Sequence, residues 1–195
     1  MAFQISDFTQ RLTGDGARPN LFQVVMTIPG VTANKLSFMA KAAQLPGATI
    51  GTVPMYYFGR EIKLAGNRSF ADWTITIIND EDFMIRNAIE VWMNSINSNA
   101  SNIRTTLPGL NISPQTGLSY AVDAQVYQYG KGGPTTANAA SGAIKGYNFV
   151  GMFPVDITPI RLDWSSNDAI EEFDVTFSYQ YWETGTAGVT NGLTT

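Results

Sequence analysis

Two stretches of this chain alternate apolar and polar residues with a period of two, which is typical of a β-strand that buries one face. Within residues 73–78, Trp73, Ile75 and Ile77 share one face. In the second stretch, one face carries Phe173, Val175, Phe177, Tyr179 and Tyr181. A helix would distribute such side chains around its axis. The alternation therefore predicts a sheet at the core of this protein.

The same periodicities predict further strands and one long helix. Strands are expected at residues 22–28, 36–43, 120–126, 147–153 and 160–164. A short helix is expected over residues 6–12, and a long one from Asn79 or Asp80 to Ile96. The long helix has an apolar stripe at spacings of three and four, namely Ile85, Ala88, Ile89, Trp92 and Ile96. Mostly antiparallel strands and one flanking helix favour an antiparallel β-barrel or an orthogonal two-sheet sandwich.

The length of 195 residues suits one domain with a full core. We expect this domain to span residues 1–183. Residues 98–118 and 130–143 are low in charge and rich in small polar residues, so they are expected to be loop insertions. Residues 184–195 are expected to form a flexible polar tail, because they hold little that could be buried.

The composition narrows the possible functions. Charged residues make up 14% of the chain, below the roughly 25% of an average globular domain, which predicts oligomerisation. The chain has no cysteine and no histidine. Disulfides, thiolate chemistry, zinc sites and Ser-His relays are therefore excluded, and we expect no cofactor and no enzymatic activity. No apolar run approaches a membrane span and no secretory signal is visible, so we expect no membrane partner and assembly in a cytoplasm.

An acidic cluster near the end of the chain is the strongest candidate for chemistry. It comprises Asp163, Asp168, Glu171, Glu172 and Asp174. The spacing does not fit a calcium loop, because Asp168 stands where glycine is needed and Glu172 comes too early. A β-sandwich hydrolase that uses Asp163 and Glu171 stays as a remote alternative to a solvated acidic turn.

The charges are divided along the chain. Residues 1–68 hold seven Lys or Arg and three acids, whereas residues 156–195 hold one Arg and seven acids. If the two ends emerge on opposite faces, this division favours head-to-tail packing of copies. If both ends lie on one side of a sheet, it does not. The sequence leaves both arrangements open.

An apolar run and a dense group of charges precede the strand at residues 73–78. The run comprises Met55, Tyr56, Tyr57 and Phe58, which fit no alternating pattern. The charged group comprises Arg60, Glu61, Lys63 and Arg68. Either the domain itself or a neighbouring subunit has to cover so much adjacent apolar surface.

Four stretches of this sequence resemble one known family. They read GREIKLAGNRSFADWTITIIND from Gly59, ARPNLFQ from Ala17, LPG from Leu45 and LDWSSNDAIEEFDVTFSYQYWE from Leu162. Taken in their order along the chain, these stretches resemble the tail tube protein of contractile-tailed bacteriophages, a family related to the tube proteins of type VI secretion systems. The resemblance covers most of residues 15–96 and 144–183.

The resemblance implies a structural virion protein of the phage tail, assembled in the host cytoplasm. It implies two packed sheets with a flanking helix and an extended loop, and hexameric rings stacked into a tube inside the contractile sheath. Partners would be other copies, the sheath, baseplate and tail-terminator proteins, and the tape-measure protein and duplex DNA in the lumen. The loop would carry the contacts between subunits through Met55, Tyr56, Tyr57, Phe58, Arg60, Glu61, Lys63 and Arg68. A tube protein of a capsid-less machine, such as a tailocin or a type VI-like system, is the alternative.

The polar faces of the strands are candidates for the wall of the lumen. They carry Thr74, Thr76, Asp123, Gln125, Asp174, Thr176, Ser178 and Gln180, with no Lys or Arg. Duplex DNA carries one charge per about 1.7 Å, so cations on the wall would bind it. A neutral or acidic wall would let DNA pass without specific binding. The alternative is a solvated face that lacks cations by chance.

Overall fold

The structure is a computed structural model that describes residues 5–12, 16–28, 35–104, 118–134 and 140–185. The strands are β1 (Phe22–Met26), β2 (Ala40–Ala43), β3 (Thr49–Tyr57), β4 (Arg60–Ser69), β5 (Trp73–Ile78), β6 (Val122–Tyr129), β7 (Ala143–Ile157), β8 (Glu172–Ser178) and β9 (Tyr181–Gly185). The helices are α1 (Ile5–Arg11), α2 (Lys35–Met39) and α3 (Met84–Ile96). The predicted loops at 98–118 and 130–143 and the predicted tail lie partly outside the described residues.

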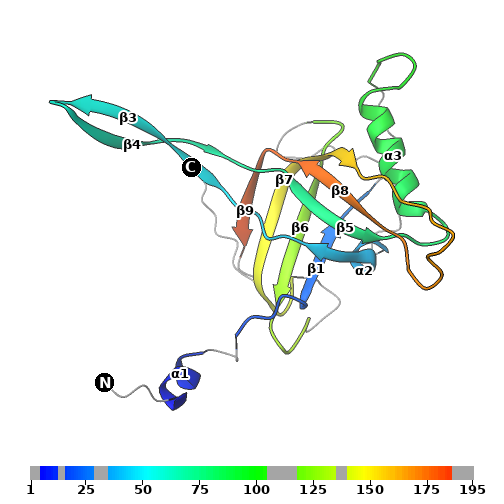
Figure 1. The fold of residues 1–195 in the computed structure, drawn as a ribbon, viewed down its shortest axis with the longest axis horizontal. Helices are drawn as coiled ribbons and strands as arrows, with labels where there is room; N and C mark the ends of the chain where they lie inside the picture. Colours follow the sequence, from blue (N-terminus) through cyan, green and yellow to red (C-terminus); the bar gives the residue numbers. More distant parts are fainter. Residues whose placement is uncertain (1–4, 13–15, 29–34, 105–117, 135–139, 186–195) are drawn as a thin grey trace.

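Strand β7 belongs to two antiparallel sheets (Figure 1). Its first half pairs with β6 on one side and β9 on the other, and β1 continues that sheet. Its second half pairs with β8, followed by β5 and β2. The strand changes sheet around Gly151, where the backbone has a positive φ of 67°. The prediction of an orthogonal two-sheet sandwich with a flanking helix is confirmed, and the path of paired strands is not closed into a barrel.

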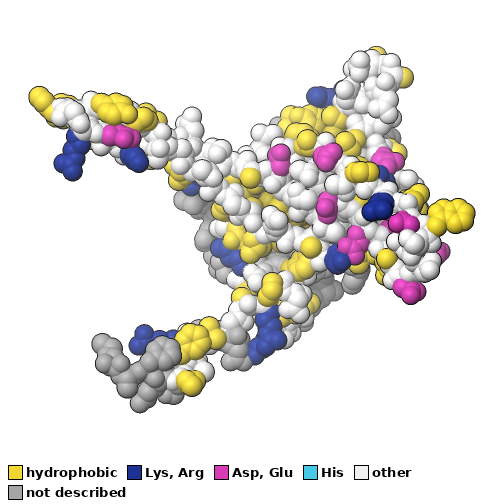
Figure 2. All heavy atoms as spheres, in the orientation of Figure 1, with side chains coloured by type: hydrophobic (Ala, Val, Ile, Leu, Met, Phe, Trp, Pro, Cys, Tyr) yellow, Lys and Arg dark blue, Asp and Glu magenta, His cyan; other side chains and the backbone are white. Residues whose placement is uncertain are grey.

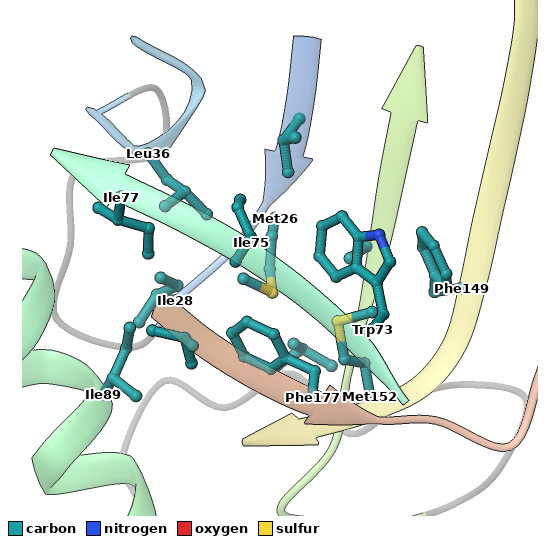
Figure 3. Packing of buried hydrophobic residues seen from close by; sticks show 14 of the residues in the cluster. Met26, Ile28, Leu36, Trp73, Ile75, Ile77, Ile89, Phe149, Met152 and Phe177 are labelled. Atoms are coloured by element: carbon teal, nitrogen blue, oxygen red, sulfur yellow. The ribbon is translucent and has the colours of Figure 1, made fainter. Parts of the chain in front are cut away.

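The inner faces of the two sheets form one apolar core (Figure 3). Trp73 of β5 packs on Phe149 of β7, with ring centroids 4.8 Å apart, and Phe177 of β8 lies 6.1 Å from Trp73. Helix α3 covers one side of this core with Trp92, whose ring lies 6.3 Å from Phe177. Each such fully buried side chain stabilises the fold by about 1.5–3 kcal/mol. The alternating strands predicted from the sequence therefore supply the core.

Helix α3 begins at Met84 and not at Asn79 or Asp80 as the sequence predicts. Phe83 has a left-handed backbone with a φ of 51°, which separates the acidic turn from the helix. Asp82 accepts a hydrogen bond from the Met84 N–H at 2.9 Å, so it acts at the helix end from outside the helix. The carboxylates in this turn also hold Lys35 from α2, which is an additional reason for the turn.

The predicted strand at residues 36–43 is a strand only in its second half. Residues 35–39 form α2, because a helical turn brings both Leu36 and Met39 onto the core. The Ser37 hydroxyl also donates to the Val24 carbonyl at 2.7 Å, which fixes this turn against β1. Over so short a segment, the spacing of apolar residues does not distinguish a helical turn from a strand.

Two predictions near the C-terminal end are also wrong. Residues 160–164 form no strand, because the Asp163 carboxylate accepts hydrogen bonds from the backbone and hydroxyl of Ser165 and makes a turn. The strand predicted over residues 173–181 is interrupted after Ser178. Past the interruption Trp182, which pairs with Phe149, takes the core side in place of Tyr181. Strand β9 then extends to Gly185, into the region predicted to be a tail.

Candidate functional site

Strands β3 and β4 form a long hairpin that projects from the body (Figure 1). The resemblance implies an extended loop here, and the structure shows that this segment forms a two-stranded hairpin. Tyr57 pairs with Arg60, so Phe58 and Gly59 form a two-residue turn. Both have positive φ, 46° and 74°, as a type I′ turn requires. Gly59 suits this conformation, whereas Phe58 is a large side chain in a backbone region that usually holds Asn, Asp or Gly.

The register of the hairpin divides the apolar run between its two faces. One face carries Val53, Met55 and Tyr57 opposite Leu64, Ile62 and, at the tip, Arg60. The other face carries Tyr56 opposite Glu61, and Pro54 opposite Lys63. The run from Met55 to Phe58 shows no alternation with polar residues, because Tyr56, on the other face, is aromatic as well. The hairpin therefore has one apolar face and one mixed face.

The hairpin exposes most of this apolar surface to solvent. All residues of β3 are exposed, and all residues of β4 except Gly66. Phe58 is 91% exposed and its ring packs only edge-on against Tyr57, with centroids 4.5 Å apart. A two-stranded hairpin is marginally stable alone in water. A partner that covers the apolar face would therefore stabilise the hairpin. This is expected of a segment that contacts another subunit, and the hairpin, residues 49–69, is called the arm below.

Packing against the body anchors both ends of the hairpin. Before β3, the Trp73 indole donates to the Gln44 carbonyl at 2.6 Å, and the Trp182 indole donates to the Gly47 carbonyl at 3.1 Å. After β4, the ring of Phe70 lies 6.2 Å from that of Trp182. These contacts were not predicted. The LPG stretch at Leu45 is the one sequence signal that lies beside them.

A close approach of the two strands fixes the twist of the hairpin. A β-carbon added to Gly66 would lie 3.0 Å from the carbonyl oxygen of Gly51, so only glycine fits there without a shift of the backbone. The pairing is irregular at this place, between Ile50 and Thr52. A bulge of this kind bends a hairpin and increases its twist. The direction of the hairpin is therefore determined near its base, where it leaves the body.

The charged residues of the hairpin remain available for a partner. Within the described part of the chain, no ion pair involves Arg60, Glu61, Lys63 or Arg68. Figure 2 shows more dark blue than magenta side chains on the hairpin, whereas the body carries both colours. The basic N-terminal part of the chain is therefore not confined to the hairpin, and its Lys41 pairs with Glu172 of the acidic part.

Five of the eight candidate lumen residues lie together on the outward face of one sheet. Thr74 and Thr76 are paired with Thr176 and Asp174, and Ser178 lies farther along β8 on the same face. The two threonine hydroxyls of the first pair are 3.1 Å apart, and Thr76 donates to Asp174 at 2.7 Å. The edge of this sheet also holds a cation that the prediction missed, Lys41, which is paired with Glu172.

The other three candidates lie elsewhere. Asp123 and Gln125 are on β6 in the other sheet, where Asp123 accepts a hydrogen bond from the Gly151 N–H at 3.0 Å. The hydroxyl of Tyr127 donates to Gln125 at 2.7 Å. Gln180 is exposed in the connection between β8 and β9. The eight residues therefore do not form one surface within a subunit.

Both carboxylates of the hydrolase alternative line one open hollow of about 430 Å³ in the connection between β7 and β8. Hydrogen bonds from the backbone and hydroxyl of Ser165 lower the pKa of Asp163, which keeps its carboxyl ionised and unsuited to donate a proton. Glu171 accepts a hydrogen bond from the Asn79 amide at 2.9 Å. The described residues contain no group of three or more acidic, cysteine or histidine side chains that could hold a metal ion.

Comparison with known proteins identifies close relatives of this chain. The sequence model of the phage tail tube protein family matches residues 17–185. The tail tube protein gp19 of Enterobacteria phage T4 is 32% identical over 180 residues, covering 92% of this chain and 99% of gp19. The tail tube protein of Serratia phage KSP90 is 22% identical, covering 90% of this chain and 93% of that protein.

Solved structures share the fold at low sequence identity. A chain of the tube-terminating cap of the anti-feeding prophage has a TM-score of 0.59 at 17% identity, covering 95% of each chain. A chain of the sheath–tube complex of an extracellular contractile injection system has a TM-score of 0.56 at 14% identity, covering 94% of this chain and 99% of that one. Among the described residues, no helix is long and apolar enough to cross a membrane.

Proposed function

Since this chain belongs to the phage tail tube protein family, we propose that six copies form a ring and that rings stack through the β3–β4 hairpin. The protein is a structural component of a contractile phage tail. The observation that carries the proposal is the hairpin itself, whose apolar face and charged residues lie in solvent in the single subunit. Met55, Tyr57 and Phe58 would supply the buried area, and Arg60 and Lys63 would set the orientation.

The proposed partners follow from the same assembly. The resemblance implies the sheath, baseplate and tail-terminator proteins, with the tape-measure protein and duplex DNA inside the tube. Solved structures with this fold come from a sheath–tube complex and from a tube-terminating cap. Contact between this chain and each corresponding partner is therefore part of the proposal, as is the absence of an enzymatic role.

The outward face that holds Thr74, Thr76 and Thr176 is our candidate for the lumen wall. Its threonines and Asp174 bond to one another, so they present few free donors to a phosphate. Each Lys or Arg that contacts a phosphate releases counterions and strengthens binding to DNA. A wall without such cations would let DNA slide, which supports a role as a conduit.

A role in a phage tail fits the comparisons better than a role in a contractile system without a capsid. The relatives at 32% identity are tail tube proteins of phages. The injection-system structures, at 17% identity or less, share the fold alone.

Native mass spectrometry and electron microscopy of the purified chain test the proposal. We expect particles of six subunits and hollow tubes built from them. A low charge fraction and an exposed apolar hairpin both favour association at micromolar concentrations. A monomer that stays stable at tens of micromolar would contradict the proposed assembly.

A further inference from the structure

The connection between β7 and β8, residues 158–171, exposes a second group of large apolar side chains. Trp164 is fully exposed, Leu162 is 79% exposed and Ile170 is 72% exposed. All three line the open hollow of about 430 Å³. A contiguous exposed patch of this kind on a small domain marks a surface that a partner covers.

This connection and the hairpin carry opposite charges. The connection and the first residue of β8 hold four carboxylates and one guanidinium, namely Asp163, Asp168, Glu171, Glu172 and Arg161. The hairpin holds three cations and one carboxylate. Glu172 is paired with Lys41, and the Arg161 guanidinium lies 3.5 Å from Asp163. Asp168 and Glu171 are in no ion pair within the described part of the chain, so these two carboxylates can meet an external cation.

The two surfaces cannot meet within one subunit. The hairpin tip and the β7–β8 connection lie at opposite ends of the long axis of the molecule (Figure 1). In Figure 2, yellow and magenta side chains gather at the end opposite the basic hairpin. Complementary patches on opposite ends of a chain produce head-to-tail contacts between copies.

We propose that the hairpin tip of one subunit docks on the β7–β8 connection of a second copy in the next ring. This inference rests on the proposed tube and names the surface that receives the hairpin. The apolar face at Met55 and Tyr57 packs against Leu162 and Trp164, and removal of this area from water drives the contact. Arg60, which pairs with Tyr57 on the same face, lies toward the carboxylates. Exposed ion pairs contribute little affinity, so their role is to fix the orientation.

Paired cysteines test the contact directly, because the natural chain has none. The test variant carries Ile62→Cys, beside Met55 on the same face of the hairpin, with Ser166→Cys, an exposed residue that lines the hollow, so the aromatic side chains of the contact are kept. A disulfide requires Cα atoms within about 7 Å, so mild oxidation of assembled tubes links only sites in contact. The matched control carries Ile62→Cys with Val91→Cys, which replaces an exposed residue of α3. We expect a ladder of covalent oligomers in denaturing gels from the test variant alone.

A charge exchange supports the same test if the chosen cysteines are poorly oriented. Arg60→Glu and Glu171→Lys should each raise the concentration needed for tube growth by about fivefold or more. Together they should restore it to within about twofold of the natural chain. Intact tubes with neither a ladder nor a rescue would overturn the docking surface and leave the tube function standing. A natural chain that forms no rings or tubes would overturn both.

Discussion

At the residue scale, the tip of the hairpin combines an unfavourable backbone with an exposed aromatic side chain. Phe58 has a φ of 46° in a turn for which Asn is the preferred residue, and it is 91% exposed. Such a conformation costs on the order of 1–3 kcal/mol for a large side chain. In the described part of the subunit, the edge-on contact with the Tyr57 ring offsets only part of this cost. A contact outside the subunit would explain why the aromatic ring is retained.

Phe58→Asn therefore separates the turn from the contact. The turn should form at least as readily as before, because Asn accepts a left-handed backbone. Amide exchange in β3 and β4 should be unchanged or slower, and the thermal midpoint of the body should stay the same. Assembly should weaken, since burial of one aromatic side chain is worth several kcal/mol at about 25 cal/mol per Å². Tubes that grow at the normal concentration would show that the ring of Phe58 contacts no partner.

At the element scale, the sequence predicts strands wherever one face is buried and the other is polar. Strand β5 and the residues of β8 show this alternation, and both are in the core. The alternation does not distinguish a helical turn from a strand at α2, where the burial of Leu36 and Met39 decides between them. Residues 160–164 alternate as well, yet Leu162 and Trp164 are exposed in a turn. Alternation indicates burial, and a partner subunit can supply the burial as well as the chain's own core.

The hairpin was missed for a related physical reason. Neither strand is buried in the subunit, and β3 shows no alternation because Tyr56 and Pro54 lie on the face opposite Met55 and Tyr57. The predicted contact residues Met55 to Lys63 are nevertheless brought together by the hairpin. The predicted lumen residues are brought together only in part. The bend of β7 separates the sheet that holds β5 and β8 from the sheet that holds β6, so residues on these strands do not share one face. At that bend Gly151 has a positive φ and its N–H donates a hydrogen bond to the Asp123 carboxylate, neither of which periodicity reveals.

The shared face of β5 and β8 gives a prediction about DNA passage. Thr176→Lys together with Ser178→Lys would place two cations on this face, where each new phosphate contact retards a sliding duplex. Virions with both substitutions should eject DNA more slowly, measured by fluorescence of released DNA, while tubes keep their normal length. Gln180→Lys is the matched control off this face. Normal ejection from the double variant would place the face away from the lumen.

At the scale of the whole molecule, a hairpin with three cations and one carboxylate lies at one end, and the acidic β7–β8 connection lies at the other (Figure 1). The charge division left two arrangements open, and the structure separates the hairpin from the acidic connection at opposite ends. Such a subunit favours repeated contacts of one kind along a line. This geometry suits a tube that grows by addition of identical rings.

Reversal of the charges on the arm is the most direct test of this account. The measurement compares tube length by electron microscopy and ring mass by native mass spectrometry for Arg60→Glu with Lys63→Glu. Arg104→Glu with Lys131→Glu, which makes the same charge change on the body, is the control. The account predicts that the arm variant keeps rings of the normal mass and no longer stacks them, because its tip then meets a carboxylate-rich surface with the same charge. Tubes of normal length from the arm variant would contradict it.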